Sequence, residues 1–124
     1  GKYNDIEGPE KNHNVEPIYF HIVLKNEKEF SCEVPDGHNS FIYLLKGQIK
    51  VGKMNHEITN DSNLILLKQG KNLQVKAEKD SEFLFIAGKP IGEPIARGGP
   101  FVMNTKAEIV EAINDYQNGT FAKY

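Results

Sequence analysis

Residues 88–105 read GKPIGEPIARGGPFVMNT and decide the fold, because they join the last strand-like run to a helical pattern near the end of the chain. Three prolines restrict the backbone of this stretch and four glycines free it at set points, while apolar residues alternate between them. The composition predicts an ordered connector. The pattern downstream of it is helical.

Thr105-Lys-Ala-Glu108 has the form of a capping box, in which the first and last side chains bond each other's backbone N–H groups. Gly119 stands where a glycine commonly ends a helix. Apolar residues recur between these signals at helical spacing, namely Ile109, Ala112, Ile113 and Tyr116. We therefore predict one amphipathic helix of about 14 residues, which we expect to dock on a sheet.

Seven runs upstream of the connector are rich in β-branched and aromatic residues and predict short strands. Pro35-Asp36-Gly37 predicts a turn, and Lys46-Gly47 predicts a hairpin between its two flanking runs. Strands at intervals of about 8 to 12 residues favour an antiparallel sandwich or barrel. Residues 1–16 are polar and predict a linker or edge segment that packs weakly. The runs are Pro17–Leu24, Glu29–Val34, Ser40–Leu45, Gln48–Lys53, Asn63–Lys68, Asn72–Ala77 and Glu82–Ala87.

The composition is that of a globular domain, with 124 residues, 39% of them hydrophobic and 26% charged. A net charge of −2 gives no attraction to phosphate, so we expect no nucleic-acid partner. No run approaches the roughly 20 apolar residues of a membrane helix. Cys32 is the single cysteine, which excludes an internal disulfide and favours a reducing, cytoplasmic location. Because the chain begins at Gly1, we expect a piece of a longer protein.

Four segments together resemble the carboxy-terminal cupin domain of pirin and pirin-like proteins. They are Ala87–Pro94, Gly99–Thr105, Asp115–Gly119 and His38–Gly47. The resemblance covers the chain from about Tyr19 to Gly119 and implies a cupin-type antiparallel β-sandwich, or jelly-roll barrel, with one C-terminal helix. It implies that residues 17–124 form this domain and that the N-terminal cupin domain is absent.

The resemblance implies that histidines and a glutamate of the N-terminal barrel hold a metal, which we expect to be iron. The family is associated with metal-dependent dioxygenation of flavonols such as quercetin, and its nuclear members act as redox-sensitive transcriptional cofactors. One departure concerns Gly98, because relatives commonly have a bulky or polar residue ahead of Gly-Pro-Phe.

A cupin metal site needs a His-x-His pair, a following glutamate and a later histidine, placed so that alternate strand residues converge on one cation. Counting back from Gly47, the glutamate position falls on Ser40, and Leu73 stands at the later histidine position. The paired histidine positions fall on Val34 and Asp36, or on Glu33 and Pro35. We therefore expect no metal or cofactor in this chain. With Ser40 pointing inward, Ile42, Leu44, Leu73 and Val75 fill the interior with aliphatic side chains.

We interpret the remaining candidate residues as structural and not as catalytic or ligand-binding. We expect His38 to lie at the surface or stabilise a turn, and His21 to be hydrogen-bonded or exposed at an edge. Cys32 is interpreted as a small buried hydrophobe. Two further histidines, His13 and His56, are assigned to solvated turns. Glu93 and Arg97 flank the connector, where packing against a neighbouring barrel is favoured over ligand contact.

These observations predict a metal-free second cupin domain, without catalytic residues, that supports a metal-bearing N-terminal cupin or contacts another protein. Two alternatives stay open. The chain is part of a quercetin 2,3-dioxygenase-like enzyme whose catalytic domain is missing here, or it is a free-standing module that binds a small molecule or a protein. The transcriptional role follows from family analogy alone.

Overall fold

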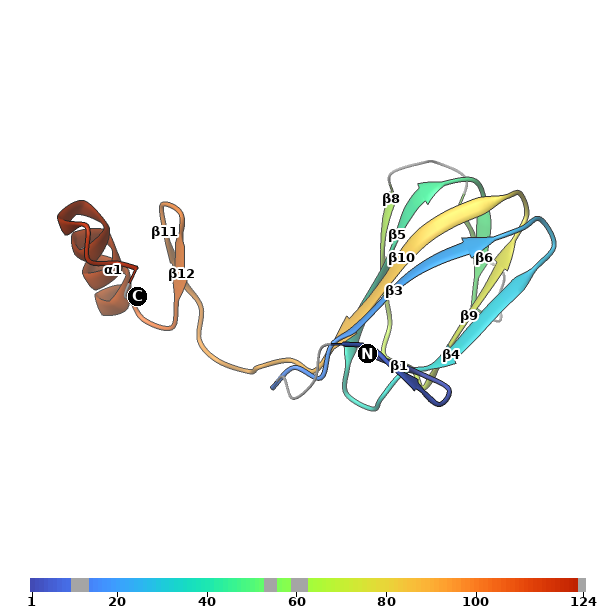
Figure 1. Cartoon of the computed structure of the whole chain (residues 1–124), viewed down its shortest axis with the longest axis horizontal. Helices are drawn as coiled ribbons and strands as arrows, with labels where there is room; N and C mark the ends of the chain where they lie inside the picture. The colour runs from blue at the N-terminus through green and yellow to red at the C-terminus, as the bar shows by residue number, and fades with distance from the viewer. Residues whose placement is uncertain (10–13, 53–55, 59–62, 123–124) are drawn as a thin grey trace. The chain divides into compact units, whose positions relative to one another are not determined.

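The computed structural model describes residues 1–9, 14–52, 56–58 and 63–122, and the chain forms two compact units, residues 1–91 and 92–124 (Figure 1). The strands of the first unit are β1 (Lys2–Tyr3), β2 (Ile6–Glu7), β3 (Ile18–Leu24), β4 (Glu29–Glu33), β5 (Asn39–Lys46), β6 (Ile49–Val51), β7 (His56–Ile58), β8 (Asn63–Leu67), β9 (Asn72–Ala77) and β10 (Ser81–Gly88). The second unit contains β11 (Ala96–Gly98), β12 (Phe101–Met103) and α1 (Lys106–Asn118).

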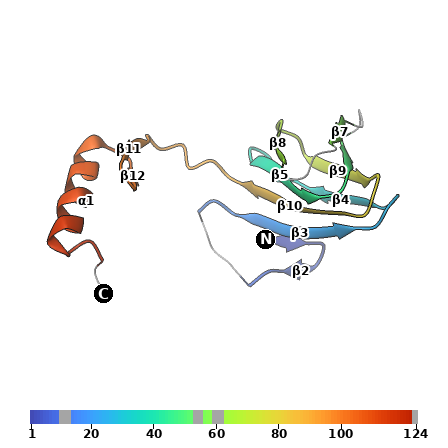
Figure 2. The ribbon, with the colours of Figure 1, turned by 90° about the horizontal axis from the view of Figure 1, so that it is seen from above.

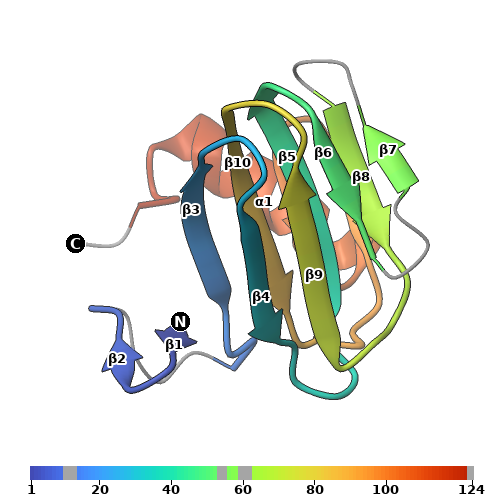
Figure 3. The ribbon, with the colours of Figure 1, turned by 90° about the vertical axis from the view of Figure 1, so that its right-hand side faces the viewer.

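The first unit is an antiparallel β-sandwich, as the sequence predicts. One sheet has the strand order β3-β10-β5-β8 and the other the order β4-β9-β6-β7. Figure 3 shows β4 and β9 in front of β10 and β5, with β6, β7 and β8 toward the same edge. Every strand pair of both sheets is antiparallel.

The core lies between the two sheets, because alternate residues of each strand point to the same face. Along the central strand β10, buried and partly exposed residues alternate strictly. Its buried residues include Phe83 and Phe85, which are both fully buried. The buried cluster comprises Ile18, Ile22, Val34, Ile42, Leu44, Ile49, Val51, Leu73, Val75, Phe83, Phe85 and Ala87. Burial of this apolar surface is the main favourable contribution to folding of the unit.

The hairpin predicted about Lys46-Gly47 is wrong. Strand β5 pairs with β10 and β8, whereas β6 pairs with β7 and β9, so the chain crosses from one sheet to the other at this point. The crossing depends on Gly47, whose φ of 94° favours glycine. Ser81 is 1% exposed and secures the crossing, since its Oγ accepts a hydrogen bond from the Gln48 N–H at 3.0 Å.

The described part of the N-terminal segment contains a short hairpin. Strands β1 and β2 form a hairpin that lies beside β3 (Figure 2). The Tyr3 ring stacks on Phe30 at 5.6 Å between centroids and meets Phe20 edge-on at 5.7 Å. Because Phe20 belongs to β3 and Phe30 to β4, Tyr3 contacts an edge strand of each sheet.

The second unit consists of the β11–β12 hairpin and the predicted helix. The capping box is present: Thr105 Oγ1 accepts from the Glu108 N–H at 3.2 Å, and the Thr105 N–H donates to Glu108 Oε2 at 2.7 Å. Gly119 ends the helix in the left-handed region, with φ of 72°. Within the unit α1 packs on the hairpin, where Ile109 and Ala112 are buried. The described helix is too short to span a bilayer.

Candidate functional site

The interior of the sandwich is where a cupin-type barrel would hold a ligand. Of the five positions predicted to line it, Ile42 and Leu44 are fully buried on β5, and Leu73 and Val75 are 4% and 2% exposed on β9. All four belong to the apolar core cluster. Ser40 is half-buried near the start of β5, in register with Ala87 and Leu67. A polar ligand would therefore have to displace packed aliphatic side chains.

The donor set for a metal ion is also missing from the part of the chain that the structure describes. Among those residues no three His, Cys, Asp or Glu side chains lie close enough to share a cation. Transition-metal sites in proteins need three or four such donors in a fixed geometry. The described residues therefore offer no site for an iron ion in this domain. The family resemblance implies such a site in the N-terminal domain instead.

His38 is buried, at 4% exposure, so of its two expected roles the structure supports the one in a turn and not the one at the surface. Its backbone N–H donates to Pro35 O at 3.2 Å, which closes the predicted turn around Gly37, where φ is 78°. Its ring Nε2 lies 3.2 Å from Glu16 O. Because a carbonyl oxygen only accepts, Nε2 donates the hydrogen of this bond. Nδ1 has no hydrogen-bond partner among the described residues.

The bond from His38 fixes the segment that leads into β3. Glu16 has a φ of 45°, which is unusual for a residue other than glycine. The preceding residue, Val15, accepts a hydrogen bond from the Lys89 N–H at 2.7 Å. Two donors from elsewhere in the first unit thus hold consecutive carbonyls of this segment. His38 stabilises the path of the chain, and this accounts for its burial without a ligand.

Cys32 and His21 have the structural roles expected of them. Cys32 is half-buried against the core, and desolvation raises the pKa of its thiol to about 11, so the thiol stays protonated near neutrality. His21 is exposed on β3, and its Nε2 lies 2.7 Å from Glu82 Oε1. Lys46 Nζ lies 3.0 Å from the other oxygen of Glu82. Bonds from Lys46 and His21 lower the pKa of the Glu82 carboxyl.

The other candidates are dispersed. His56 lies in β7 and not in a turn, so that assignment is wrong, while His13 lies outside the described residues. Glu93 and Arg97 are in the second unit. Glu93 Oε2 accepts a hydrogen bond from Asn104 Nδ2 at 2.6 Å, which ties the connector to the residue before the helix cap. Arg97 is exposed in β11, opposite Val102.

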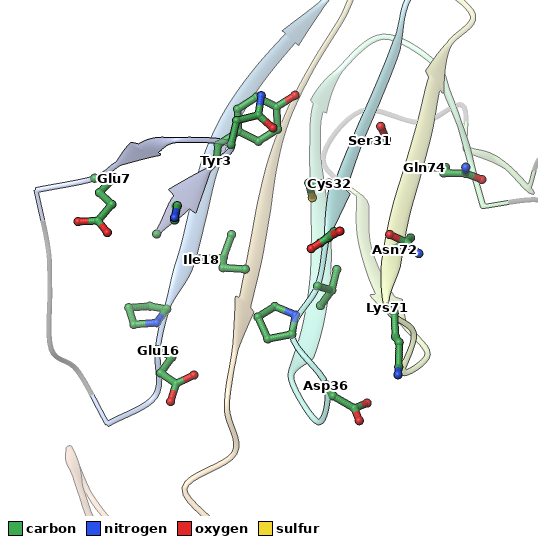
Figure 4. Close-up of a pocket in the computed structure, with 18 of the residues that line it drawn as sticks. Tyr3, Glu7, Glu16, Ile18, Ser31, Cys32, Asp36, Lys71, Asn72 and Gln74 are labelled. Carbon is green, nitrogen blue, oxygen red and sulfur yellow. The ribbon is translucent and has the colours of Figure 1, made fainter.

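An open cleft of about 1820 Å³ lies between the N-terminal segment and the ends of β4 and β9 (Figure 4). It exceeds the roughly 300–1,000 Å³ typical of ligand pockets. Its lining mixes acids, lysines and amides with Ile18 and Val34, two residues at the border of the apolar core. The labelled residues are Tyr3, Glu7, Glu16, Ile18, Ser31, Cys32, Asp36, Lys71, Asn72 and Gln74.

The sandwich and the terminal helix carry a family signature over most of the chain. Residues 19–122 match the sequence profile of the "Pirin C-terminal cupin domain". The chain belongs to the pirin family. In homologues of this family such a domain follows an N-terminal cupin domain.

Pirin relatives and a solved structure agree with this assignment. A tomato (Solanum lycopersicum) pirin-like protein is 38% identical over 104 residues, covering 82% of this chain and 36% of the relative. Human pirin is 36% identical over 104 residues, with the same coverage. The crystal structure of an Acinetobacter baumannii quercetin 2,3-dioxygenase is 36% identical, with a TM-score of 0.85, covering 99% of this chain and 42% of that one. The chain thus spans about two fifths of the length of the proteins it matches.

The packing of α1 on the β11–β12 hairpin explains why a glycine stands at position 98. A β-carbon at this position would overlap the Ile109 side chain, so glycine lets the helix approach the β11–β12 hairpin closely. Three features were not predicted from the sequence: the role of Tyr3, the burial of His38 and the outward-facing residues of the β3-β10-β5-β8 sheet. The near-continuous apolar runs along β3, β5 and β10 carried a signal for the outward-facing residues, because a strand with such a run is apolar on both faces.

Proposed function

We propose that this chain is the metal-free second cupin domain of a pirin-like protein. In this role it supports a metal-bearing N-terminal cupin domain and offers a surface to that domain or to another protein. No catalytic residue is assigned to the chain, and the family metal, which we take to be iron, belongs to the N-terminal domain. The predicted cytoplasmic location rests on the single cysteine and stays a prediction.

The observation that carries this proposal is the filled interior. Ile42, Leu44 and Phe85 occupy the space between the sheets where a barrel of this type would need polar donors. His38 Nδ1 is buried without a hydrogen-bond partner among the described residues, but a single imidazole does not hold a transition metal without further donors. We therefore propose that the domain acts on the N-terminal cupin domain as a stable support and through its surface, and not through chemistry of its own.

Metal analysis of the purified chain tests the proposal. The chain is incubated with Fe(II), Ni(II) or Zn(II), desalted, and measured by plasma mass spectrometry beside the Acinetobacter baumannii protein as a reference. We expect less than stoichiometric metal, with no change in the His38→Ala variant. One metal ion per chain, lost when three of its own side chains are replaced one at a time, would overturn the proposal.

A second candidate function is favoured by the Acinetobacter baumannii structure, whose protein is called a quercetin 2,3-dioxygenase. Here the chain completes an enzyme whose catalytic domain precedes it. The test compares quercetin consumption by the chain alone with consumption by the chain joined to the preceding part of that relative. Activity in the joined protein alone supports this candidate, and inactivity of both counts against it.

The open cleft favours a third candidate, a free-standing binding module. Its polar lining at Asn72, Gln74 and Lys71 offers donors and acceptors to a small molecule. Titration of the labelled chain with quercetin, followed by amide chemical shifts, provides the test. Saturable shifts confined to the ends of β4 and β9 support a binding module, and unchanged spectra count against quercetin as its ligand.

A further inference from the structure

The outer face of the β3-β10-β5-β8 sheet is apolar across its whole width. Strands β3 and β8 form the two edges of this sheet, and β10 and β5 lie between them. Paired residues of neighbouring strands point to the same side, so the register identifies the side chains that share this face. We call the following residues the apolar face: Tyr19, Val23, Phe41, Tyr43, Leu64, Leu66, Leu84 and Ile86.

Two continuous rows make up most of this surface. The register places Tyr19, Ile86, Phe41 and Leu66 side by side in the first row, and His21, Leu84, Tyr43 and Leu64 in the second. Leu66 is 77% exposed, Tyr19 61% and Leu64 58%. Monomeric proteins rarely expose a contiguous apolar patch larger than a few hundred Å². The continuity of the face and the exposure of its large apolar side chains therefore indicate an interaction surface.

The other sheet of the sandwich provides an internal comparison. The outward residues of β4, β9 and β6 are polar, as in the registered pairs Glu29 with Lys76 and Ser31 with Gln74. Lys76 Nζ lies 3.0 Å from Glu27, and Lys50 Nζ lies 3.1 Å from Glu78. An antiparallel sheet that faces water on one side has this alternation of apolar inward and polar outward residues. One outer face is thus suited to water and the opposite one is not.

We propose that the apolar face is the docking surface for the domain that precedes this one in longer pirin-like proteins. The inference rests on the proposed function and names the surface through which the domain acts. The chain covers 36% of human pirin and 42% of the Acinetobacter baumannii protein, so most of each relative lies outside the matched part. The matched family is a C-terminal domain, and in homologues an N-terminal cupin domain precedes it in the same polypeptide.

The chemistry of the face fits an apolar surface of a neighbouring folded domain. Tyr19 and Tyr43 combine a large apolar ring with a hydroxyl that bonds at the rim of an interface. The ionic cluster of His21, Glu82 and Lys46 lies at one end of the face. Charged residues confined to the border of an apolar centre are typical of protein interfaces. We therefore expect the partner to bury the centre near Tyr43 and Leu64 and to leave Glu82 at the rim.

Thiol protection tests this surface directly. In a Cys32→Ala background, Leu66→Cys probes the apolar face and Glu29→Cys probes the polar sheet, because both positions are exposed and point outward. Each variant is labelled with Ellman's reagent, as the chain alone and joined to the preceding part of the Acinetobacter baumannii protein. We expect labelling at position 66 to fall by about tenfold or more on joining, because a buried thiol reacts only during local opening. Labelling at position 29 stays unchanged.

Equal labelling at position 66 in the isolated and joined proteins would overturn the inference. Protection of position 66 in the isolated chain would overturn it too, since another segment or a second copy would then cover the face. Light scattering of the isolated chain identifies a second copy. A further arm does not depend on folding of the joined protein. The preceding domain is produced as a separate chain, and we expect it to copurify with the wild type and Glu29→Gln but not with Leu66→Glu. Copurification with all three, or with none, contradicts the inference.

The metal analysis of the isolated chain separates this inference from the proposed function. A protected face together with stoichiometric metal would leave the docking surface intact and overturn the metal-free role. An unprotected face in a metal-free chain would overturn the docking surface and leave the metal-free role intact.

Discussion

Replacing Gly47 with alanine is expected to destabilise the first unit more than the same replacement at Gly37. Both residues have a positive φ, 94° and 78°, which costs an L-residue about 1–2 kcal/mol. They differ in their surroundings. A β-carbon at Gly37 would have nothing within 4 Å, whereas one at Gly47 would lie 2.5 Å from Asp80 O and 2.7 Å from Ser81 Cα.

The difference in surroundings sets the magnitude. The backbone strain is common to both variants, so Gly37→Ala loses about 1–2 kcal/mol of unfolding free energy. Atoms of the Asp80 and Ser81 backbone cannot rotate away from the new methyl group at Gly47, and overpacking of this kind adds about 1–3 kcal/mol. The total of about 2–5 kcal/mol for Gly47→Ala is a large part of the 5–15 kcal/mol that stabilises a typical domain.

Urea unfolding followed by circular dichroism measures both variants against the wild type. Unchanged slopes with shifted midpoints would show that the native state, and not the denatured state, carries the effect. The prediction requires Gly47→Ala to be the less stable variant by at least about 1 kcal/mol. Equal midpoints for the two variants would refute the reasoning, because they would mean that the crossing from β5 to β6 does not pack on Ser81.

Three further predictions concern charge, reactivity and capping. Glu82→Gln should be less stable than wild type near neutrality, because bonds from Lys46 and His21 hold the Glu82 pKa below its usual value. That stabilisation is present above the unfolded-state pKa and is lost as the pH falls through the folded pKa, so urea midpoints that still differ in strong acid contradict it. Cys32, with its pKa raised to about 11, should react with iodoacetamide in mild alkali at least about tenfold more slowly than free cysteine, and an equal rate contradicts this. Thr105→Ala should lose about 1 kcal/mol of helix stability while Thr105→Ser retains it, and equal helix content by circular dichroism in the two variants speaks against the cap.

Local signals account for the parts of the fold that the sequence predicts well. The helix follows from Thr105, Glu108 and Gly119, whose effects act within a few residues along the chain. The strand at Asn72–Ala77 has the predicted bounds, because its apolar residues alternate between turn residues. Where the interactions are local in sequence, pattern and structure agree.

The errors arise where pairing is decided by distant segments. Two strands separated by Lys46-Gly47 have the local appearance of a hairpin, but β10 and β8 already occupy both sides of β5. Tyr3 contacts Phe20 and Phe30 only because the two edge strands are brought together by the fold. No pattern within residues 1–16 encodes those partners. The burial of His38 likewise depends on the Glu16 carbonyl, 22 residues earlier in the chain.

The filled interior and the apolar face are connected by a single physical argument. A barrel that binds a metal must keep polar donors in its interior, and each buried donor costs stability unless it is bonded. In this chain Ile42 and Leu73 occupy interior positions, and the core gains the stability of apolar packing instead. A more stable core supports a sheet whose second face is also apolar, as Leu64 and Leu66 show, and that face is unfavourable in water unless another domain covers it. The sheet that lines the interior is therefore also the sheet through which we expect the domain to act.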